Sequence, residues 1–288
     1  MRRPRLRFAL VALLLALALS FLVCCGSPAG RAAVFPSPPV ETAAAGKVLM
    51  LASAARTQTL ASGSKRQTGT FLGELYEPYR ALQAAGYRVT LATVAGGRVA
   101  IDPESLKEKY WDTAEHLAAA QRFVATSGEL RAPLALDRAL SGADDYQGLV
   151  IPGGQGVMVD LLESAEAQAL LARFAAHDRP IGLVCHAPAL LTRVKPAGRL
   201  ARRVVTSVSG LEELFIETFV MGEEASERGI GDRLEQHGYQ HSVAFPGSSF
   251  AVRDCNLVTS QNPFSTGDFS RLYLRALEDF RRGARCAL

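Results

Sequence analysis

The sequence predicts an α/β fold of the flavodoxin-like kind, with a mainly parallel sheet and helices on both of its faces. Apolar runs at 48–52, 148–151 and 181–184 lack the alternation of a half-exposed strand, as expected of strands buried on both faces. Amphipathic segments with helical spacing lie between the runs. Strands that alternate with helices favour a parallel sheet, because parallel neighbours need long crossover connections.

The elements are expected in a regular order from residue 47 onward. After the first strand comes a polar loop and then a helix over 71–86, with Leu72, Leu75, Tyr79 and Leu82 on one face. No internal repeat interrupts the order, so we expect one domain over residues 46–283. The further elements are expected as strands over 87–94, 148–151, 181–184, 203–208, 242–245 and 250–259, and as helices over 111–123, 157–177, from 188, from 211 and over 268–282.

The first 25 residues have the pattern of an export signal. Four arginines precede an apolar run over 8–23, and two cysteines and small residues follow it. The end of this run resembles a bacterial lipoprotein box, which implies lipidation of Cys25, although Cys24 stands where a small residue is usual; an uncleaved anchor is the alternative. Residues 26–45 are rich in Pro, Ala, Gly and Ser, which indicates a flexible linker. We therefore expect an exported, periplasmic or cell-envelope protein.

The charge pattern excludes some functions. The formal net charge is +4, with much of the excess in the extreme N-terminus and the tail and no basic stripe interleaved with aromatic residues, so nucleic-acid binding is not expected. The five histidines form no metal-ligand spacing with cysteines, and we expect no metal and no cofactor. Of the five cysteines, Cys255 and Cys286 could pair in an oxidising compartment, but the sequence does not decide this.

Cys185 is the candidate nucleophile. It stands where the apolar run 181–184 ends and a helix is expected, with Pro188 near the first turn. Small neighbours allow a sharp turn of the nucleophile-elbow type, which raises the side chain above the sheet edge. A thiol at a helix N-terminus is favoured in its thiolate form. The alternative is an ordinary buried thiol, and this segment alone does not separate the two.

Two further segments belong to the same sheet edge. Residues 153–156 read Gly-Gly-Gln-Gly between a strand and a helix, where glycine N–H groups can bind an oxyanion. A phosphate loop is excluded, because the Gly-Lys-Ser/Thr ending is absent. Glu74 lies in the first turn of the first helix, also at the carboxyl edge of a strand, where it could instead serve only to compensate the helix dipole.

In combination these segments resemble the ThiJ/PfpI superfamily, which has the class I glutamine amidotransferase-like fold. Two further segments resemble its heat-inducible chaperone and glyoxalase III branch, and the similarity covers about residues 47–280 in order. The segments that carry the resemblance are Glu74–Pro78, Asp144–Gly154, Val184–Pro188, and, for the branch, Ile101–Ser105 and Leu257–Pro263.

The resemblance implies roles for particular residues. Cys185 matches the family nucleophile, His186 the adjacent histidine, and Glu74 the carboxyl that hydrogen-bonds the thiolate. Glu213 is the best match to an acidic residue that orients the histidine, and Glu212 is the alternative by one register. Gly154 and the backbone N–H of His186 would form the oxyanion hole. Many relatives of this branch have Gly-Gly-His-Gly, so Gln155 replaces a histidine here and could alter or abolish activity.

The resemblance implies a glutathione-independent glyoxalase that converts methylglyoxal to lactate through a hemithioacetal on Cys185, or a related deglycase or hydrolase. Its partner would be a small reactive carbonyl compound, a homodimer is possible, and membrane contact is expected only through the N-terminal anchor. The alternative is a redox-sensing chaperone or stress-response binding module without turnover. A glutamine amidotransferase is disfavoured, because no His-x-Glu pair follows Cys185.

Overall fold

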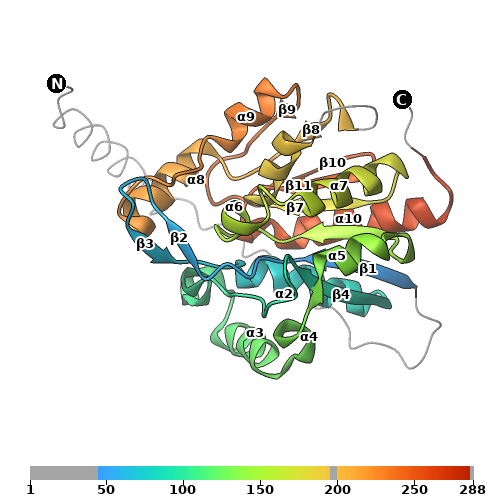
Figure 1. Cartoon of the computed structure of the whole chain (residues 1–288), viewed down its shortest axis with the longest axis horizontal. Helices are drawn as coiled ribbons and strands as arrows, with labels where there is room; N and C mark the ends of the chain where they lie inside the picture. Colours follow the sequence, from blue (N-terminus) through green and yellow to red (C-terminus); the bar gives the residue numbers. More distant parts are fainter. Residues whose placement is uncertain (1–44, 195–199, 286–288) are drawn as a thin grey trace, which may run out of the picture. The chain divides into compact units, whose positions relative to one another are not determined.

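The structure, a computed structural model, describes residues 45–194 and 200–285. Its centre is a seven-stranded sheet with the strand order β10-β11-β7-β6-β1-β4-β5 (Figure 1). All neighbours pair in parallel except β10 and β11, which form an antiparallel edge. The predicted α/β fold with a mainly parallel sheet is confirmed. The strands are β1 (Gly46–Leu51), β4 (Tyr87–Thr93), β5 (Leu134–Ala135), β6 (Gly148–Ile151), β7 (Ile181–Val184), β10 (Ala251–Asp254) and β11 (Leu257–Ser260).

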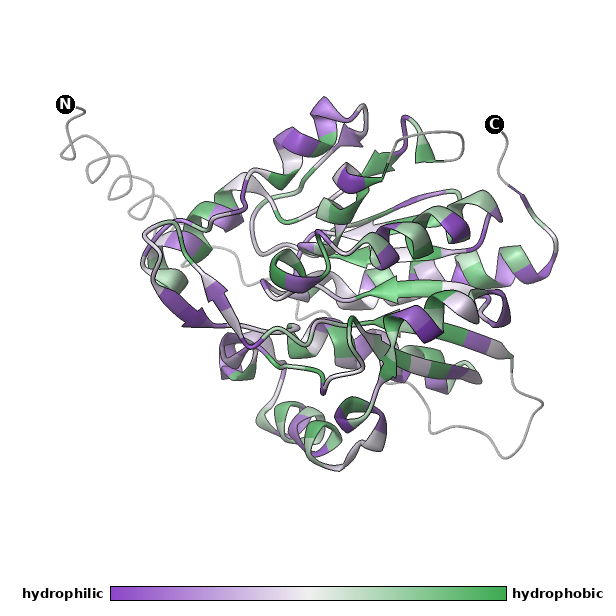
Figure 2. Ribbon diagram, viewed as in Figure 1, coloured by the Kyte–Doolittle hydropathy of each residue, from purple (hydrophilic) through white to green (hydrophobic). Residues whose placement is uncertain are grey.

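Two pairs of helices flank the sheet. α2 (Leu72–Ala84) packs against α10 (Thr266–Arg281), and these helices contact β4 and β7 respectively. α5 (Leu136–Ser141) packs against α7 (Ala165–Ala176), which contacts β6 and β7. The central strands β6 and β7 are buried along their whole length, as their apolar sequences predict. In Figure 2 the strands at the centre of the sheet are coloured mainly in the green of hydrophobic residues.

The remaining helices lie outside this central arrangement. One of them, α3 (Ala114–Thr126), is a regular helix, and the other ten described here are short 3₁₀, α or π segments, several of which carry residues at the carboxyl edge of the sheet. They are α4 (Gly128–Arg131), α6 (Val157–Asp160), α8 (Gly210–Phe215), α9 (Ile230–Gln236), the 3₁₀ helices η1 (Pro103–Leu106), η2 (Glu108–Tyr110), η3 (Ala143–Asp145), η4 (Ala187–Arg193) and η7 (Pro263–Ser265), and the π-helix η6 (Ile216–Met221).

The helix expected over 157–177 is two helices. α6 ends at Asp160, and α7 begins after Ser164, whose hydroxyl accepts a hydrogen bond from the N–H of Ala167 at 3.2 Å. A serine cap of this kind starts a new helix, because it satisfies an N–H that lacks a partner in the first turn. The apolar periodicity continues through the break, so the sequence pattern did not reveal it.

The strand expected over 242–245 is wrong. The short strand here is β9 (Gln240–His241), which pairs with β8 (Val204–Val205) in a separate two-stranded sheet. Beyond it, the N–H of Ala244 donates to the side chain of Gln261 at 2.8 Å instead of to a strand partner. A second small sheet, between β2 (Thr57–Thr59) and β3 (Lys65–Gln67), lies in the segment expected as a polar loop.

Cys255 stands at the turn of the β10–β11 hairpin, with a φ of 57°, and takes part in a disulfide. Cys286, its candidate partner from the sequence, lies outside the described residues, as do residues 1–44 with the expected signal, linker and Cys25. Cys185 is a free, buried cysteine.

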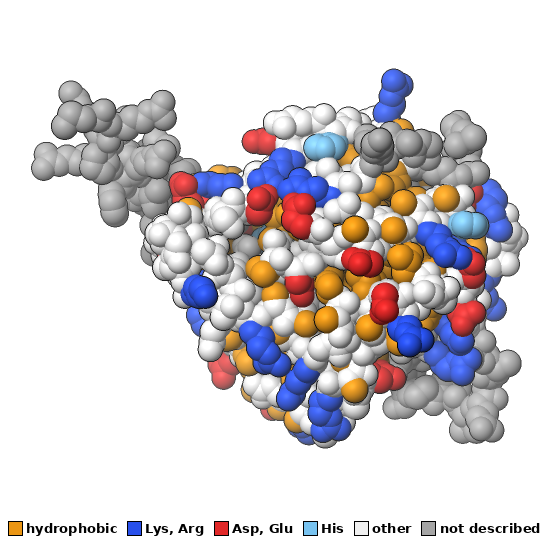
Figure 3. All heavy atoms as spheres, in the orientation of Figure 1, with side chains coloured by type: hydrophobic (Ala, Val, Ile, Leu, Met, Phe, Trp, Pro, Cys, Tyr) orange, Lys and Arg blue, Asp and Glu red, His pale blue; other side chains and the backbone are white. Residues whose placement is uncertain are grey.

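The described surface carries both signs of charge. Lys and Arg side chains lie interspersed with Asp and Glu over the face in Figure 3, and many of them form ion pairs such as Arg203–Asp254 and Arg253–Asp279. Within residues 45–194 and 200–285, no helix is long and apolar enough to cross a membrane. The same residues contain no group of three or more His, Cys, Asp or Glu side chains placed to hold a metal ion.

Candidate active site

Cys185 occupies a sharp turn directly after β7. Its φ is 59°, in the left-handed region that non-glycine residues seldom adopt. The backbone is held there from both sides: the N–H of Cys185 donates to the carbonyl of Ser260 at 2.8 Å, and its carbonyl accepts from the N–H of Val208 at 2.9 Å. A strained conformation of this kind costs about 1–3 kcal/mol and persists only where neighbouring structure enforces it. The predicted elbow is therefore present, although a 3₁₀ helix, η4, follows it instead of an α-helix.

The side chains of Cys185, His186 and Gln155 lie in contact, one after the other. The sulfur lies 3.1 Å from Nδ1 of His186, and Nε2 of His186 lies 3.0 Å from Nε2 of Gln155. All three side chains are buried. They form a short chain of contacts from the sulfur through the imidazole to the Gln155 amide, which comes from the loop after β6.

Glu74 approaches the thiol from the first turn of α2. A Cβ placed on Gly153 would lie 2.6 Å from Oε2 of Glu74 and 2.8 Å from Cβ of Cys185, so only a glycine allows the carboxyl and the cysteine to come this close. Burial raises the pKa of Glu74 to about 8, although the Cys185 thiol and the N–H of Gly153 lower it in part. Neither carboxyl oxygen of Glu74 has a hydrogen bond of good geometry, so its contacts with the Cys185 thiol and the N–H of Gly153 are poorly aligned. At neutral pH the Glu74 carboxyl is therefore mostly protonated.

Burial also controls the other two titratable groups. It raises the pKa of the Cys185 thiol well above its usual value, as do the negative charges of Glu74 and Glu212, and the backbone N–H of His186 offsets this only in part. Burial lowers the pKa of His186 to about 4, so the imidazole is neutral at neutral pH. The helix-terminus effect expected from the sequence is outweighed by desolvation, and the resting protein holds a thiol.

The glycine loop presents backbone N–H groups to the same edge. Gly154 has a φ of +99°, and a Cβ there would lie 2.5 Å from the carbonyl oxygen of Gly69 and 2.6 Å from the nitrogen of Phe71, so the position requires glycine. Among the backbone hydrogen bonds of the described residues, none has the N–H of Gly154 as its donor. Gly153, the preceding residue, lies against Cys185 and Glu74, and the backbone N–H of His186 acts on the thiol. The role of Gly154 in an oxyanion hole stays a prediction.

The structure does not bring Glu213 to the His186 ring. Glu213 accepts a hydrogen bond from the N–H of Gly229 at 3.1 Å, and burial raises the pKa of this carboxyl to about 7. Its neighbour Glu212 carries the charge that affects Cys185, His186 and Glu74.

Glu212 acts as a structural anchor beside the site. Its carboxylate completes the capping box of α8 with Ser209 and accepts hydrogen bonds from three segments near the sheet edge. The donors are the N–H of Gly247 at 2.9 Å, the side chain of Gln261 at 3.0 Å and the side chain of Asn262 at 2.8 Å. Because these bonds use both carboxylate oxygens, Glu212 holds the loops around the cysteine in place.

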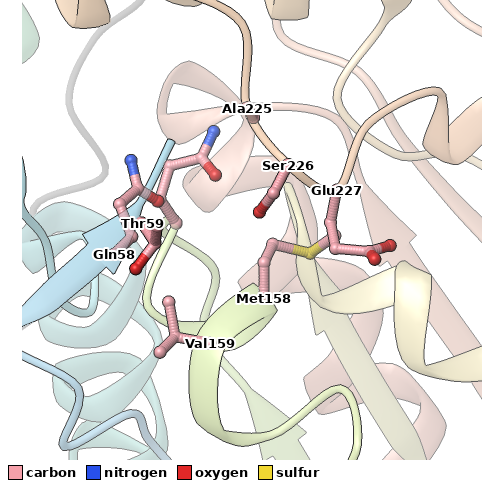
Figure 4. Close-up of a pocket in the computed structure, with 8 residues that line it drawn as sticks. Gln58, Thr59, Met158, Val159, Ala225, Ser226 and Glu227 are labelled. Carbon is pink, nitrogen blue, oxygen red and sulfur yellow. The ribbon is translucent and has the colours of Figure 1, made fainter. Parts of the chain in front are cut away.

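A pocket with a volume of about 200 Å³ lies beside Gln155 (Figure 4). One wall comes from β2, one from α6 and one from the segment before α9. The hairpin and that last segment are tied together by the hydrogen bond from the N–H of Ala61 to the carbonyl of Glu224 at 3.1 Å. Polar and apolar side chains both contribute to the lining, which consists of Gln58, Thr59, Gln155, Met158, Val159, Ala225, Ser226 and Glu227.

Tyr110 is a site residue that sequence reasoning missed. Burial raises the pKa of the Tyr110 phenol, and the charges of Glu104, Asp102 and, least, Cys185 add to this, so Tyr110 lies within electrostatic range of the sulfur. Its ring contacts Phe71 edge-on with centroids 5.0 Å apart, and its hydroxyl donates to Oε1 of Glu104 at 3.1 Å. Tyr110 lies in the irregular segment between two strands, where no motif marked it.

Comparison with known proteins decides the family. The profile of the DJ-1/PfpI family matches residues 68–276, which is well over half of the chain and includes Glu74, Gln155 and Cys185. The chain belongs to the DJ-1/PfpI family. This confirms the resemblance expected from the sequence.

Relatives within the DJ-1/PfpI family include enzymes of the glyoxalase and deglycase type. The protein/nucleic acid deglycase HchA of Pseudomonas aeruginosa (strain LESB58) is 30% identical over 152 residues, which cover 50% of this chain and 49% of HchA. The chain thus spans about half the length of this relative. The glutathione-independent glyoxalase hsp3101 of Schizosaccharomyces pombe is 26% identical over 83% of this chain and 99% of its own. The crystal structure of glyoxalase III from Candida albicans matches with a TM-score of 0.67 at 21% identity, over 81% of this chain and 97% of that chain, which supports the fold.

Proposed function

We propose that this DJ-1/PfpI protein is a glutathione-independent glyoxalase, which converts methylglyoxal and water to lactate with Cys185 as the nucleophile. The observation that carries the proposal is the contact of one buried thiol with both a carboxyl group, Glu74, and a neutral imidazole, His186, at the carboxyl edge of the sheet. The names of its relatives, a glyoxalase and a deglycase, support the same class of chemistry. A related deglycase activity would use the same thiol.

The first step is addition to the aldehyde. The reactive form is the one in which Glu74 is ionised while Cys185 keeps its proton. In this form the thiol proton passes from sulfur to the Glu74 carboxylate, and the sulfur electron pair forms a C–S bond to the aldehyde carbon. The C=O π electrons move to the oxygen, where the N–H groups of Gly154 and His186 stabilise the negative charge until the oxygen takes the proton from Glu74. The product is a hemithioacetal next to the ketone.

The second step moves a proton between the two carbons. Glu74, a carboxylate again after the first step, removes the proton from the former aldehyde carbon as a C=C bond forms, and the hydroxyl proton passes from the first oxygen to the ketone oxygen, which gives an enediolate with its charge on the first oxygen. That oxygen then re-forms a C=O bond while the neighbouring carbon takes the proton back from Glu74. The product is a lactoyl thioester, so one carbon is oxidised and the other reduced without an external redox partner. Water then cleaves the C–S bond, releases lactate and restores the thiol.

The pocket in Figure 4 offers a place for the substrate next to the Gln155–His186 contact. Its amide and hydroxyl groups suit carbonyl and hydroxyl oxygens of a small polar molecule. Burial of the catalytic groups excludes water from the charged intermediates.

The test follows methylglyoxal loss and lactate formation by the full chain, with no glutathione added. We expect turnover by the wild-type protein and none by Cys185→Ala. Absence of turnover by the reduced wild-type protein would contradict the glyoxalase function and favour a binding protein without turnover.

We also propose that the domain works outside the cytoplasm, attached by a lipid on Cys25. The basic and apolar N-terminal sequence supports this, and so does the disulfide at Cys255, since disulfides persist mainly in oxidising compartments.

A further inference from the structure

The imidazole of His186 has two polar neighbours of different character. Its Nδ1 faces the Cys185 sulfur at 3.1 Å, and its Nε2 faces the amide nitrogen of Gln155 at 3.0 Å. We propose that Gln155 is a positioning residue that fixes His186 in the tautomer with its proton on Nδ1, so that the imidazole donates a hydrogen bond to the sulfur. The tautomer stands independently of the proposed function, whereas its kinetic consequence rests on it.

The hydrogen-bond donors of Gln155 and His186 determine this tautomer. An amide nitrogen has two N–H groups and no acceptor lone pair, so a hydrogen bond from it to Nε2 requires that Nε2 carry no proton. A neutral imidazole has one ring proton, which must then lie on Nδ1. An imidazolium would place an N–H against the N–H of Gln155, which is repulsive. Burial of the ring independently disfavours the charged form.

Gln155 is held well enough to perform this task. Its side chain is 8% exposed. The loop that carries it is fixed on both sides of the residue, because the carbonyl of Gly154 accepts from the N–H of Val157 at 3.3 Å and the N–H of Gly156 donates to the carbonyl of Gly69 at 3.1 Å. A Cβ on Gly156 would lie 2.5 Å from Oγ of Ser53, so this loop packs tightly against the end of β1.

The tautomer assigns separate roles to the two groups beside the sulfur. With its proton on Nδ1, His186 cannot accept the thiol proton, but it can stabilise the thiolate by donating to it. The proton must pass to Glu74, the other group in contact with the sulfur. The remaining charged or titratable groups that act on this cluster are Glu212 from α8, Asp102 before η1, and Tyr110 in η2.

Nitrogen-15 spectroscopy of the full chain with labelled histidine tests the tautomer directly, because protonated and unprotonated ring nitrogens have distinct chemical shifts. The His186 signals are identified by their loss in His186→Gln. We expect the pattern of a neutral ring with a protonated Nδ1 in the wild-type protein at neutral pH. A neutral ring with a protonated Nε2, or an imidazolium, would overturn the proposal.

In Gln155→Glu a carboxylate faces Nε2 of His186. Because a carboxylate accepts hydrogen bonds and does not donate them, it favours a proton on Nε2. We expect the Nε2–H tautomer or the imidazolium in this variant, and we expect turnover to fall at least about 10-fold in kcat. Gln58→Glu adds the same charge to the same pocket away from His186, since Gln58 contacts Met221, and should leave the His186 pattern unchanged. An unchanged pattern in Gln155→Glu would overturn the proposal.

Gln155→Leu serves if the glutamate variant does not fold. It removes the donor, so a mixture of both tautomers is expected, and a wild-type pattern in this variant would contradict the assignment. The spectra need no substrate. A protonated Nδ1 without glyoxalase turnover would therefore leave the tautomer standing while the proposed function fails.

Discussion

Cys185 and Glu74 compete for protons in a site from which water is largely excluded. Burial raises the pKa of both groups, and the charge of Glu74 raises the pKa of the Cys185 thiol further, whereas the hydrogen bond with the thiol lowers the pKa of Glu74 in part. Their protons therefore leave in two steps that belong to the pair and not to either residue. The reactive form is the one in which the pair has lost one proton.

The activity is expected to depend on pH through the ionisation of Glu74. We expect kcat/KM for methylglyoxal to rise with pH toward about 8, the pKa of Glu74. No inflection is expected at the ordinary histidine pKa of 6.5, because burial lowers the pKa of His186 to about 4. Initial rates measured across this range in wild-type protein provide the test. A single inflection near 6.5, removed in His186→Gln, would contradict the assignment of roles.

The raised pKa of Glu74 also makes the free energy of unfolding depend on pH. The pKa of Glu74 is 4.5 in its ordinary state and about 8 in the fold. Between these values the folded protein keeps a proton that the unfolded chain has lost, so the free energy of unfolding falls as pH rises through this window. A shift of this size corresponds to about 5 kcal/mol, as an upper figure.

Glu74→Gln cannot ionise, so it lacks the fall in the free energy of unfolding that Glu74 causes between pH 4.5 and pH 8. We therefore expect the variant to gain stability relative to the wild-type protein over this range, by up to a few kcal/mol. Urea denaturation at both ends of the window measures the difference. Glu213, whose pKa is raised to about 7, contributes a slope of the same sign in both proteins and cancels in the comparison. If the free energies of unfolding of the variant and the wild-type protein differ by the same amount at both pH values, Glu74 ionises normally in the fold.

The site was predictable in part at this scale. Cys185, His186 and Glu74 stand at strand–helix junctions, so the sequence could place them at one edge of the sheet, and the structure brings them together. Successive residues of a helix point about 100° apart, and the sequence could not decide between Glu212 and Glu213. The contact of Gln155 with His186 depends on the path of a tightly packed loop. The spacing of residues in the sequence does not predict that path.

At the scale of elements, the two strand–helix loops after β6 and β7 form one unit. Gly153 lies where the first loop passes the second, and a Cβ there would lie 2.5 Å from the carbonyl oxygen of Val184 as well as against Glu74 and Cys185. The close approach of these loops places Gly153 between the Glu74 carboxyl and Cys185, with its N–H directed to the carboxyl.

Gly153→Ala should therefore damage the site. We expect loss of stability of about 1–3 kcal/mol from overpacking and a loss of turnover of at least about 10-fold, because the thiol and carboxyl must separate. Gly267→Ala is the matched control: a Cβ in this first turn of α10 meets nothing within 4 Å, so activity should be unchanged and stability slightly increased. Thermal denaturation and the lactate assay measure both effects. Wild-type activity in Gly153→Ala would show that the two loops need not be this close.

The regular elements were predicted well where burial alone determines the pattern. β1, β4, β6, β7, α2 and α10 lie at or within a few residues of the expected positions. Between 200 and 250 the structure depends on side-chain contacts across the sequence, such as Gln261 with Ala244, and on the capping box of Glu212. Local periodicity contains no information on such contacts, which explains the wrong strand over 242–245.

At the scale of the whole molecule, the proposed attachment to the membrane predicts a contrast between two adjacent cysteines. Cys25→Ala should abolish incorporation of a labelled fatty acid and release the protein from the membrane fraction, whereas Cys24→Ala should leave both unchanged, because only the cysteine at the cleavage site receives the lipid. Labelling followed by cell fractionation measures this. Equal labelling of both variants would contradict lipidation at Cys25.

The central claim is that the Cys185 sulfur forms a covalent bond to the substrate during turnover. The most direct measurement is the mass of the peptide that contains Cys185, taken from the full chain mixed with methylglyoxal and quenched in acid during turnover. We predict an increase by the mass of one methylglyoxal on this peptide, since the hemithioacetal and the lactoyl thioester are isomers, and its decay as substrate is exhausted. Turnover to lactate with no added mass on Cys185, or undiminished turnover by Cys185→Ala, would contradict the account.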